Sequence, residues 1–251
     1  MAFGAIIIGD EIMRGKRQDK HMAQLIAILR KRGLTLAWCQ YLGDDPALIT
    51  ATLKRTLAAG DVVFSFGGIG ATPDDHTRGC AAAAAGVGLA LHPEAEAEIR
   101  GRFGADITPS RLKMGEFPRG ASIIPNSYNR IPGFSLGEHH FVPGFPIMAW
   151  PMVEWVLDQR YVHLFHQQPE AEASIMVYNS GEGTLIPLMQ AVEAKYRGLK
   201  VFSLPSVGED GRRRHIELGA RGVPEEVPLA LEELKRGVVE AGGTWEARGA
   251  A

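Results

Sequence analysis

The amino-terminal part of the chain alternates short apolar runs with segments whose apolar residues recur at helical spacing. The run from Phe3 to Ile8 is rich in β-branched residues, lacks polar alternation and stops at Gly9-Asp10, which predicts a buried strand. Leu34 to Leu42 and Asp61 to Phe66 are the second and third predicted strands. Strands that alternate with helices predict right-handed crossovers and hence a parallel sheet.

Helices are predicted where apolar residues recur every three or four positions, or where a capping residue precedes such a stretch. These segments are the face Met22, Leu25, Ile26 and Leu29, the stretch after Asp45-Pro46 with Ile49, Leu53, Thr56 and Leu57, and residues 77–85, 93–103, 109–116 and 148–157. Residues 121–146 differ, because prolines and glycines punctuate short strand-like pieces there. The fold class predicted for this part is therefore an α/β domain built on a parallel sheet.

The composition becomes polar at residues 163–169, and a second series of elements follows. Strand patterns at 173–178, 199–204, 215–218 and 244–246 and two helix faces between them give the order βαββαβ, which is that of a ferredoxin-like unit. We therefore predict an α/β domain over residues 1–165 and a small α+β domain over residues 170–248. The small domain has no polar cluster, so we expect it to support assembly or site closure.

The charge balance and cysteine count narrow the class of protein. A formal net charge of −2 provides no basic field to hold nucleic acid. The two cysteines, Cys39 and Cys80, are too few for a disulfide framework, which suits a reducing compartment. No apolar run is long enough to span a bilayer, and no signal-peptide pattern precedes Asp10. We expect a cytoplasmic protein that binds neither nucleic acid nor membranes.

A glycine-rich loop, Gly67 to Asp75, follows the third predicted strand and precedes a predicted helix. Such a loop lets main-chain N–H groups approach a ligand, and the helix N-terminus favours anions. It lacks the Gly-Lys-Ser/Thr of a phosphate-binding Walker loop, and the third glycine of a dinucleotide fingerprint would fall at Pro73. The alternative is a turn in which Asp75 only caps the helix. The expected ligand-binding residues are Gly67, Gly68, Ile69, Gly70, Thr72, Asp74, Asp75 and Thr77, while Arg78 is as well explained as a surface residue.

Pairs of carboxylates follow the first three predicted strands, at 10–11, 44–45 and 74–75. The carboxyl ends of parallel strands meet at one edge of a sheet, so these loops are expected to converge on one crevice. Asp10, Asp44 and Asp75 are the candidate catalytic and metal-binding residues. They would either hold a divalent cation, with Mg²⁺ favoured, or accept hydrogen bonds from N–H and O–H groups of a pterin, purine or ribose. The sequence leaves both uses open.

An ordered set of motifs carries a family resemblance. The motifs are Gly9-Asp10-Glu11-Ile12 with Gly15, Gly43-Asp44-Asp45, residues 67–78, Pro125-Asn126, Pro132-Gly133-Phe134 and Val142-Pro143-Gly144-Phe145-Pro146. Over about residues 3–160 the chain resembles the molybdopterin-binding (MoaB/Mog) domain family, closest to the amino-terminal part of the competence-damage-inducible protein CinA and to the corresponding domain of FAD synthase. Ala71 stands where this family usually has proline, and His21 where asparagine is common.

The resemblance implies a three-layer fold, a homo-oligomer, and binding of molybdopterin or an adenine-containing pyrophosphate at the glycine loop. It makes Asp44 and Asp75 the motif aspartates and adds Pro143 and Gly144 to the ligand-binding residues. The first function expected is binding of molybdopterin or a related phosphorylated pterin or nucleotide, in molybdenum-cofactor metabolism. The alternative is a divalent-metal-dependent pyrophosphatase that cleaves ADP-ribose or FAD-like dinucleotides, because some relatives of the CinA type do so.

Overall fold

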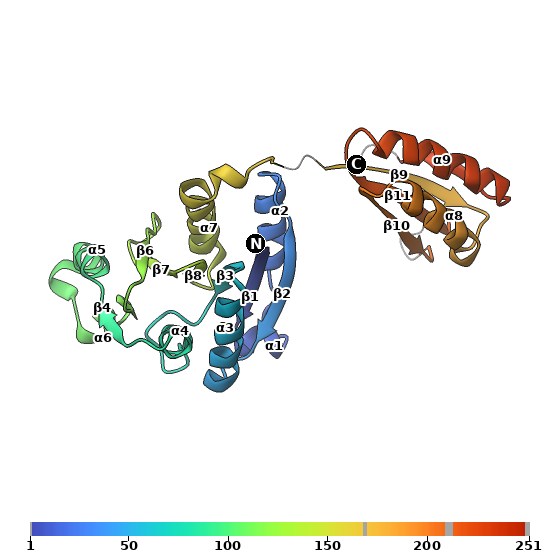
Figure 1. Ribbon diagram of the computed structural model, residues 1–251. Helices are drawn as coiled ribbons and strands as arrows, with labels where there is room; N and C mark the ends of the chain where they lie inside the picture. Colours follow the sequence, from blue (N-terminus) through green and yellow to red (C-terminus); the bar gives the residue numbers. More distant parts are fainter. Residues whose placement is uncertain (1, 168–169, 209–212, 249–251) are drawn as a thin grey trace. The chain divides into compact units, whose positions relative to one another are not determined.

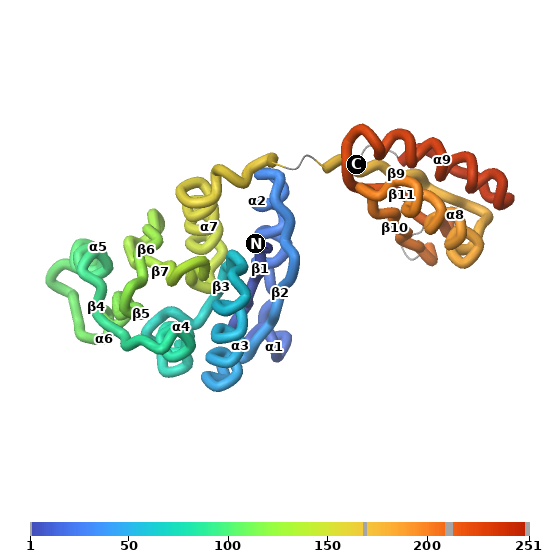
Figure 2. Tube along the Cα trace, viewed as in Figure 1, coloured from blue at the N-terminus to red at the C-terminus, as the bar shows by residue number. Residues whose placement is uncertain are grey.

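The computed structural model describes residues 2–167, 170–208 and 213–248, and its chain forms two compact units, Met1–His166 and Gln167–Ala251 (Figure 1, Figure 2). Each unit has its own sheet and its own buried core. No helix among the described residues is long and apolar enough to cross a membrane.

The first unit is built on a six-stranded sheet in the order β2-β1-β3-β8-β7-β6. Its strands are β1 (Phe3–Ile8), β2 (Leu36–Leu42), β3 (Val62–Phe66), β6 (Ser122–Ile124), β7 (Gly133–Leu136) and β8 (His139–Val142). Strands β2, β1, β3 and β8 pair in parallel, whereas β7 runs antiparallel to both of its neighbours. The sheet is therefore mostly parallel, as the alternation of strands and helices predicts.

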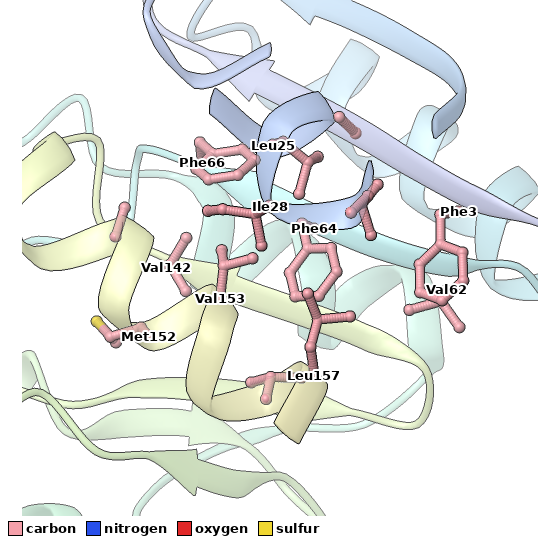
Figure 3. Close-up of a cluster of buried hydrophobic side chains, with 14 of the residues drawn as sticks. Phe3, Leu25, Ile28, Val62, Phe64, Phe66, Val142, Met152, Val153 and Leu157 are labelled. Atoms are coloured by element: carbon pink, nitrogen blue, oxygen red, sulfur yellow. The ribbon is translucent and has the colours of Figure 1, made fainter. Parts of the chain in front are cut away.

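Helices cover both faces of this sheet and complete three layers (Figure 1). The helices α2 (His21–Arg30) and α7 (Pro146–Arg160) pack on one face, in the core drawn in Figure 3. The helices α3 (Pro46–Ala59) and α4 (Thr77–Ala85) pack on the other face. Along β1 the side chains of Ala5 and Ile7 enter the first core and that of Ile6 enters the second, because successive strand residues point to opposite faces.

The remaining elements of this unit include short ones that were not predicted, and two predicted helices have different bounds. The remaining elements are α1 (Asp10–Met13), β4 (Leu89–Leu91), α5 (Pro93–Phe103), η1 (Gly104–Asp106), α6 (Pro109–Lys113), β5 (Glu116–Pro118) and η2 (Val162–Leu164). The predicted helix over 109–116 ends at Lys113, because Glu116–Pro118 pairs antiparallel with Leu89–Leu91. Helix α7 (Pro146–Arg160) is longer than the predicted helix over 148–157 and contains Pro151 in its interior.

The second unit is an α+β fold of the predicted ferredoxin-like type. Its elements are β9 (Ala171–Tyr178), α8 (Glu182–Lys195), β10 (Leu199–Ser206), β11 (His215–Gly222), α9 (Val227–Glu240) and β12 (Thr244–Ala247). The strands form an antiparallel sheet in the order β10-β11-β9-β12, and both helices contribute to its core. The Asp210-Gly211 pair predicts a turn between the strands of residues 199–204 and 215–218, and that pair lies outside the described residues.

Candidate functional site

A pocket of about 420 Å³ lies in the first unit, next to the carboxyl ends of β1, β3 and β8. This is the edge at which ligands bind open α/β sheets. Its lining comprises Ile8, Gly9, Glu11, Arg17, Asp44, Gly67, Gly68, Ile69, Gly70, Ala71, Thr72, Asp74, Asp75, Met114, Asn126, Asn129, Ile131, Pro132, Pro143, Gly144, Phe145 and Met148. Of the residues expected from the sequence to form the site, all but Asp10 and Thr77 line this pocket.

The glycine loop enters the pocket between two strand ends. Gly67 has a φ of 102°, in the region that favours glycine, and its N–H donates to the carbonyl of Val142 at 3.0 Å. A Cβ atom at this position would lie 2.3 Å from the carbonyl oxygen of Ile8. The close approach of the loop to β1 and β8 therefore requires glycine at position 67.

The carbonyl groups of the loop are held from the side of α4. The Thr77 hydroxyl donates to the Gly67 carbonyl at 3.1 Å, and the Thr77 N–H donates to the Gly68 carbonyl at 3.0 Å. The Arg78 guanidinium donates to the Gly70 carbonyl at 2.6 Å. In a planar trans peptide the N–H group points opposite to the preceding carbonyl. The N–H groups of residues 68, 69 and 71 therefore point away from these donors.

Four consecutive main-chain N–H groups of the loop are available to a ligand. Within the part of the chain that the structure describes, the N–H groups of Gly68, Ile69, Gly70 and Ala71 donate no hydrogen bond. All four residues line the pocket. Successive unpaired N–H groups form a concave, positively polarised surface of the kind that binds anions.

Asp75 holds the loop in shape instead of capping the following helix. Its Oδ2 accepts hydrogen bonds from the N–H of Thr72 at 2.7 Å and from the Thr72 hydroxyl at 2.5 Å. The N-terminal cap of α4 is His76, which makes no side-chain cap hydrogen bond. The helix-cap alternative for Asp75 is therefore wrong, because its carboxylate turns back to the loop.

One member of each of the first two carboxylate pairs lines the pocket, namely Glu11 and Asp44. The contacts of Asp44 show how its carboxylate is held. Its Oδ2 accepts a hydrogen bond from the N–H of Asp10 at 2.9 Å. Burial raises the pKa of the Asp44 carboxyl, the Asp10 N–H opposes that effect, and the neighbouring charges of Asp10, Glu11 and Asp74 raise the pKa further. The Asp10 carboxylate instead pairs with Arg14 at 2.6 Å and lies outside the pocket lining.

The metal site expected from Asp10, Asp44 and Asp75 does not fit this arrangement. Among the described residues no three His, Cys, Asp or Glu side chains are grouped so that they could hold a metal ion. The Asp10 oxygens are used by Arg14 and by the N–H of Asp44, and one Asp75 oxygen is used by Thr72. Asp10, Asp44 and Asp75 therefore do not form a metal-binding group in this arrangement.

The pocket lining also contains two asparagines that the sequence reasoning did not select as site residues, Asn126 and Asn129. Asn126 is buried; its amide donates to the Ile131 carbonyl at 2.9 Å and its oxygen accepts from the Tyr128 N–H at 3.1 Å. Asn129 accepts from the Ile131 N–H at 3.0 Å. A signal was present, since asparagine followed by an apolar turn indicates side-chain to main-chain hydrogen bonds.

His21 supports the loop after β8. Its Nε2 donates to the Gly144 carbonyl at 3.1 Å, and its ring stacks on Phe66 with centroids 4.5 Å apart. Burial lowers the pKa of the His21 imidazole. The side chain that replaces the family's usual asparagine is therefore a neutral donor that positions the main chain beside the pocket.

The mostly parallel sheet, the glycine loop and the pocket at the strand ends define a three-layer α/β fold of the type that binds ligands at its carboxyl edge. Within that class, residues 4–163 match the family described as "Probable molybdopterin binding domain". The chain belongs to this family.

Several curated proteins named "CinA-like protein" are similar to this chain. The protein of Anaeromyxobacter sp. (strain Fw109-5) is 31% identical over 240 residues, which cover 86% of this chain and 57% of that protein. The protein of Geobacter sulfurreducens (strain ATCC 51573 / DSM 12127 / PCA) is 30% identical over 261 residues, covering 96% of this chain and 62% of that protein. The chain thus spans about six tenths of the length of these relatives.

A solved structure has the same fold as the first unit. It is the protein CinA from Thermoplasma acidophilum, described as having unknown function. The TM-score is 0.58 at 27% sequence identity, with 63% of this chain and 98% of that chain covered. The resemblance to CinA stated from the sequence motifs is confirmed.

Proposed function

We propose that the pocket binds a phosphate-bearing heterocycle, molybdopterin or a related pterin or nucleotide, with a phosphate group against the loop of residues 68–71. The observation that carries the proposal is the set of four N–H groups that are unpaired within the described residues, of which those of residues 68, 69 and 71 face away from the donors of α4. Main-chain N–H groups suit phosphate oxygens because the fold fixes their positions and each N–H carries a partial positive charge.

The remaining lining supports a ligand with a flat ring and polar substituents. Met114, Ile131, Pro132, Phe145 and Met148 offer apolar surface to a ring. The carboxylates of Asp44 and Glu11 can accept hydrogen bonds from amine or hydroxyl groups. A volume of about 420 Å³ lies within the usual range for small-molecule sites.

Membership of a molybdopterin-binding domain family and similarity to proteins named CinA-like support the choice of ligand class. On this basis we propose a role in molybdenum-cofactor metabolism.

Calorimetric titration of the protein with inorganic pyrophosphate, ADP-ribose and molybdopterin tests the proposal. A variant that fills the pocket provides the comparison: a Cβ at Gly144 meets nothing closer than the Gly67 Cα at 3.5 Å, so Gly144→Leu should fold and obstruct binding. Gly181→Leu in the second unit is the control, since a Cβ there meets nothing within 4 Å. Absence of heat with all three ligands, or unchanged binding by Gly144→Leu, would reject the proposal.

Metal-dependent cleavage of ADP-ribose or FAD is the weaker alternative. It requires a cation held between carboxylates and phosphate, and the three expected aspartates are not gathered for that purpose. Incubating the protein with ADP-ribose or FAD, with and without Mg²⁺, Mn²⁺ or Co²⁺, separates the two functions. We expect binding without release of AMP; metal-dependent AMP release would favour the pyrophosphatase.

A further inference from the structure

Arg78 is a buried arginine directly behind the glycine loop. It lies in the first turn of α4, and only 8% of its surface is exposed. One terminal nitrogen donates to the Gly70 carbonyl at 2.6 Å, and the other donates to the carbonyls of Glu116, at 3.2 Å, and of Lys113. The guanidinium thus joins the loop to the segment between α6 and β5.

All the hydrogen-bond partners of Arg78 in the described residues are main-chain carbonyls. Burial lowers the pKa of this guanidinium, although arginine remains protonated in proteins. A charge taken out of water is costly unless hydrogen bonds compensate it. An arginine placed here with carbonyl partners from two separate segments is suited to fixing those segments against each other.

Both segments contribute to the pocket. The bond to the Gly70 carbonyl orients the peptide between residues 70 and 71, so that the Ala71 N–H points away from Arg78. Met114 lies between the two other carbonyl acceptors and lines the pocket. One side chain therefore governs the direction of a loop donor and the position of the apolar wall.

We infer that Arg78 is a positioning residue, which sets both the orientation of the loop N–H groups and the place of Met114 without touching the ligand. The inference rests on the proposed function, because it assigns the loop N–H groups to a phosphate. Arg78 is absent from the pocket lining, so it would not contact a ligand there, and its hydrogen bonds act on the main chain of the loop.

Arg78→Lys separates positioning from simple attraction of an anion. Lysine retains the positive charge but replaces a planar fork by a single ammonium, which cannot hold the three carbonyls in the same geometry. If Arg78 acts by charge, the lysine variant should bind pyrophosphate as the wild type does. If it acts by position, the dissociation constant should rise about tenfold, the effect of losing a hydrogen bond to a charged group.

Arg32→Lys is the matched control. Arg32 is equally buried, at 9% exposed, and also uses its fork, on Asp158, but it does not line the pocket or contact the loop. We expect this variant to melt at a lower temperature and to bind pyrophosphate with an affinity within about twofold of the wild type.

A ligand-independent measurement uses methionine methyl groups. With ¹³C-methyl-labelled methionine, Arg78→Lys should shift the Met114 signal in the free protein and leave the Met148 signal, from α7, in place. An unchanged Met114 signal, or wild-type affinity in Arg78→Lys, overturns the inference. Failure of the wild type to bind pyrophosphate, ADP-ribose or molybdopterin overturns the proposed function instead, and the methyl spectrum then decides the inference alone.

If Arg78→Lys does not fold, Arg78→Gln provides the second variant, because its shorter side chain has one donor nitrogen and cannot hold the carbonyls of both segments in the same geometry. Its Met114 signal and its affinity are judged by the same criteria. If neither variant folds while Arg32→Lys does, Arg78 serves folding as a whole and the positioning role is rejected.

Discussion

Asp10 and Asp44 each accept a hydrogen bond from the main chain of the other, at 2.9 Å from the Asp10 N–H and at 3.2 Å from the Asp44 N–H. The loops after β1 and β2 are thereby joined. A Cβ at Gly43 would lie 2.6 Å from Oδ1 of Asp10, so a side chain at this position would displace the Asp10 carboxylate from the reciprocal pair. Of the two, only Asp44 lines the pocket, and one oxygen of its carboxylate is already fixed by the Asp10 N–H.

Asp44→Asn should change the affinities for two ligands in opposite directions. Its amide oxygen can still accept from Asp10, so the free energy of unfolding should change by less than about 1 kcal/mol. Removing a negative charge should tighten inorganic pyrophosphate about threefold, whereas ADP-ribose, which offers hydroxyl and amine donors, should bind more weakly. Calorimetry with both ligands checks this. Asp45→Asn is the control, since Asp45 caps α3 and asparagine caps as well.

Substitutions of Asp75 and Asp74 should change the affinity for pyrophosphate in opposite directions. Asp75→Ala removes the acceptor for Thr72 and should weaken pyrophosphate binding about fivefold, because the loop loses its hydrogen-bonded shape. Asp74→Ala removes an exposed charge from the pocket rim and should strengthen it slightly. If Asp75 acts through the loop, adding Thr72→Val to Asp75→Ala should cost less than the sum of the two single effects. Additive losses would mean that Asp75 contacts the ligand directly.

Acid should destabilise the first unit partly through His139. This buried imidazole donates to the Thr56 hydroxyl at 2.9 Å, and burial lowers its pKa to about 4 from 6.5, against the opposing charges of Asp61 and Glu138. Below pH 6.5 the unfolded chain binds a proton that the folded chain refuses until its own pKa is reached. Stability from this group is therefore lost as pH falls from 6.5 to about 4, by up to about 3 kcal/mol.

His139→Gln retains a donor for Thr56 but does not titrate. Urea unfolding at about pH 7 and about pH 4.5 should give a smaller pH difference in stability for this variant than for the wild type. An equal difference in both proteins would show that His139 contributes nothing to acid sensitivity.

A chain ending at Gln167 should fold and bind by itself. The first unit has its own buried core, and every pocket residue lies between positions 8 and 148. We expect one cooperative melting transition and a dissociation constant for pyrophosphate within about twofold of that of the full chain. Sedimentation of the same fragment tests the separate expectation that the second unit supports a homo-oligomer, which predicts a smaller assembly. A full-sized assembly would contradict it.

Local sequence signals accounted for the elements with strong patterns. The strand Phe3–Ile8 begins and ends as predicted, because six consecutive apolar residues are bounded by a turn. The pair formed by Leu89–Leu91 and Glu116–Pro118 was missed, since each strand has three residues and its partner is distant in the chain. The antiparallel direction of β7 could not be predicted either. The prolines and glycines around it indicate that turns are present, but they do not show in which direction the strand runs.

For the candidate site, the sequence predicted which residues lie near the pocket better than it predicted what their side chains contact. The carboxyl edge of a parallel sheet gathers the loops after successive strands, so the residues near the pocket could be selected. A threonine or aspartate side chain can point into the pocket or towards the main chain of the loop. The choice depends on its side-chain rotamer, which the residue type alone does not determine. Thr77 is fully buried with its hydroxyl on Gly67, and Arg78 is enclosed, although first-turn polar residues are commonly exposed.

If a ligand is bound by main-chain N–H groups, the side chains of the residues that donate them need not be of one particular type. Ala71, which is exposed, would present its N–H group whatever side chain it carried, so we expect substitutions there to be tolerated as long as the peptide geometry is kept. The exception is proline, which has no N–H. Ala71, standing where the family usually has proline, therefore gives this chain a donor that such relatives lack, and a phosphate would meet one more partner here than there.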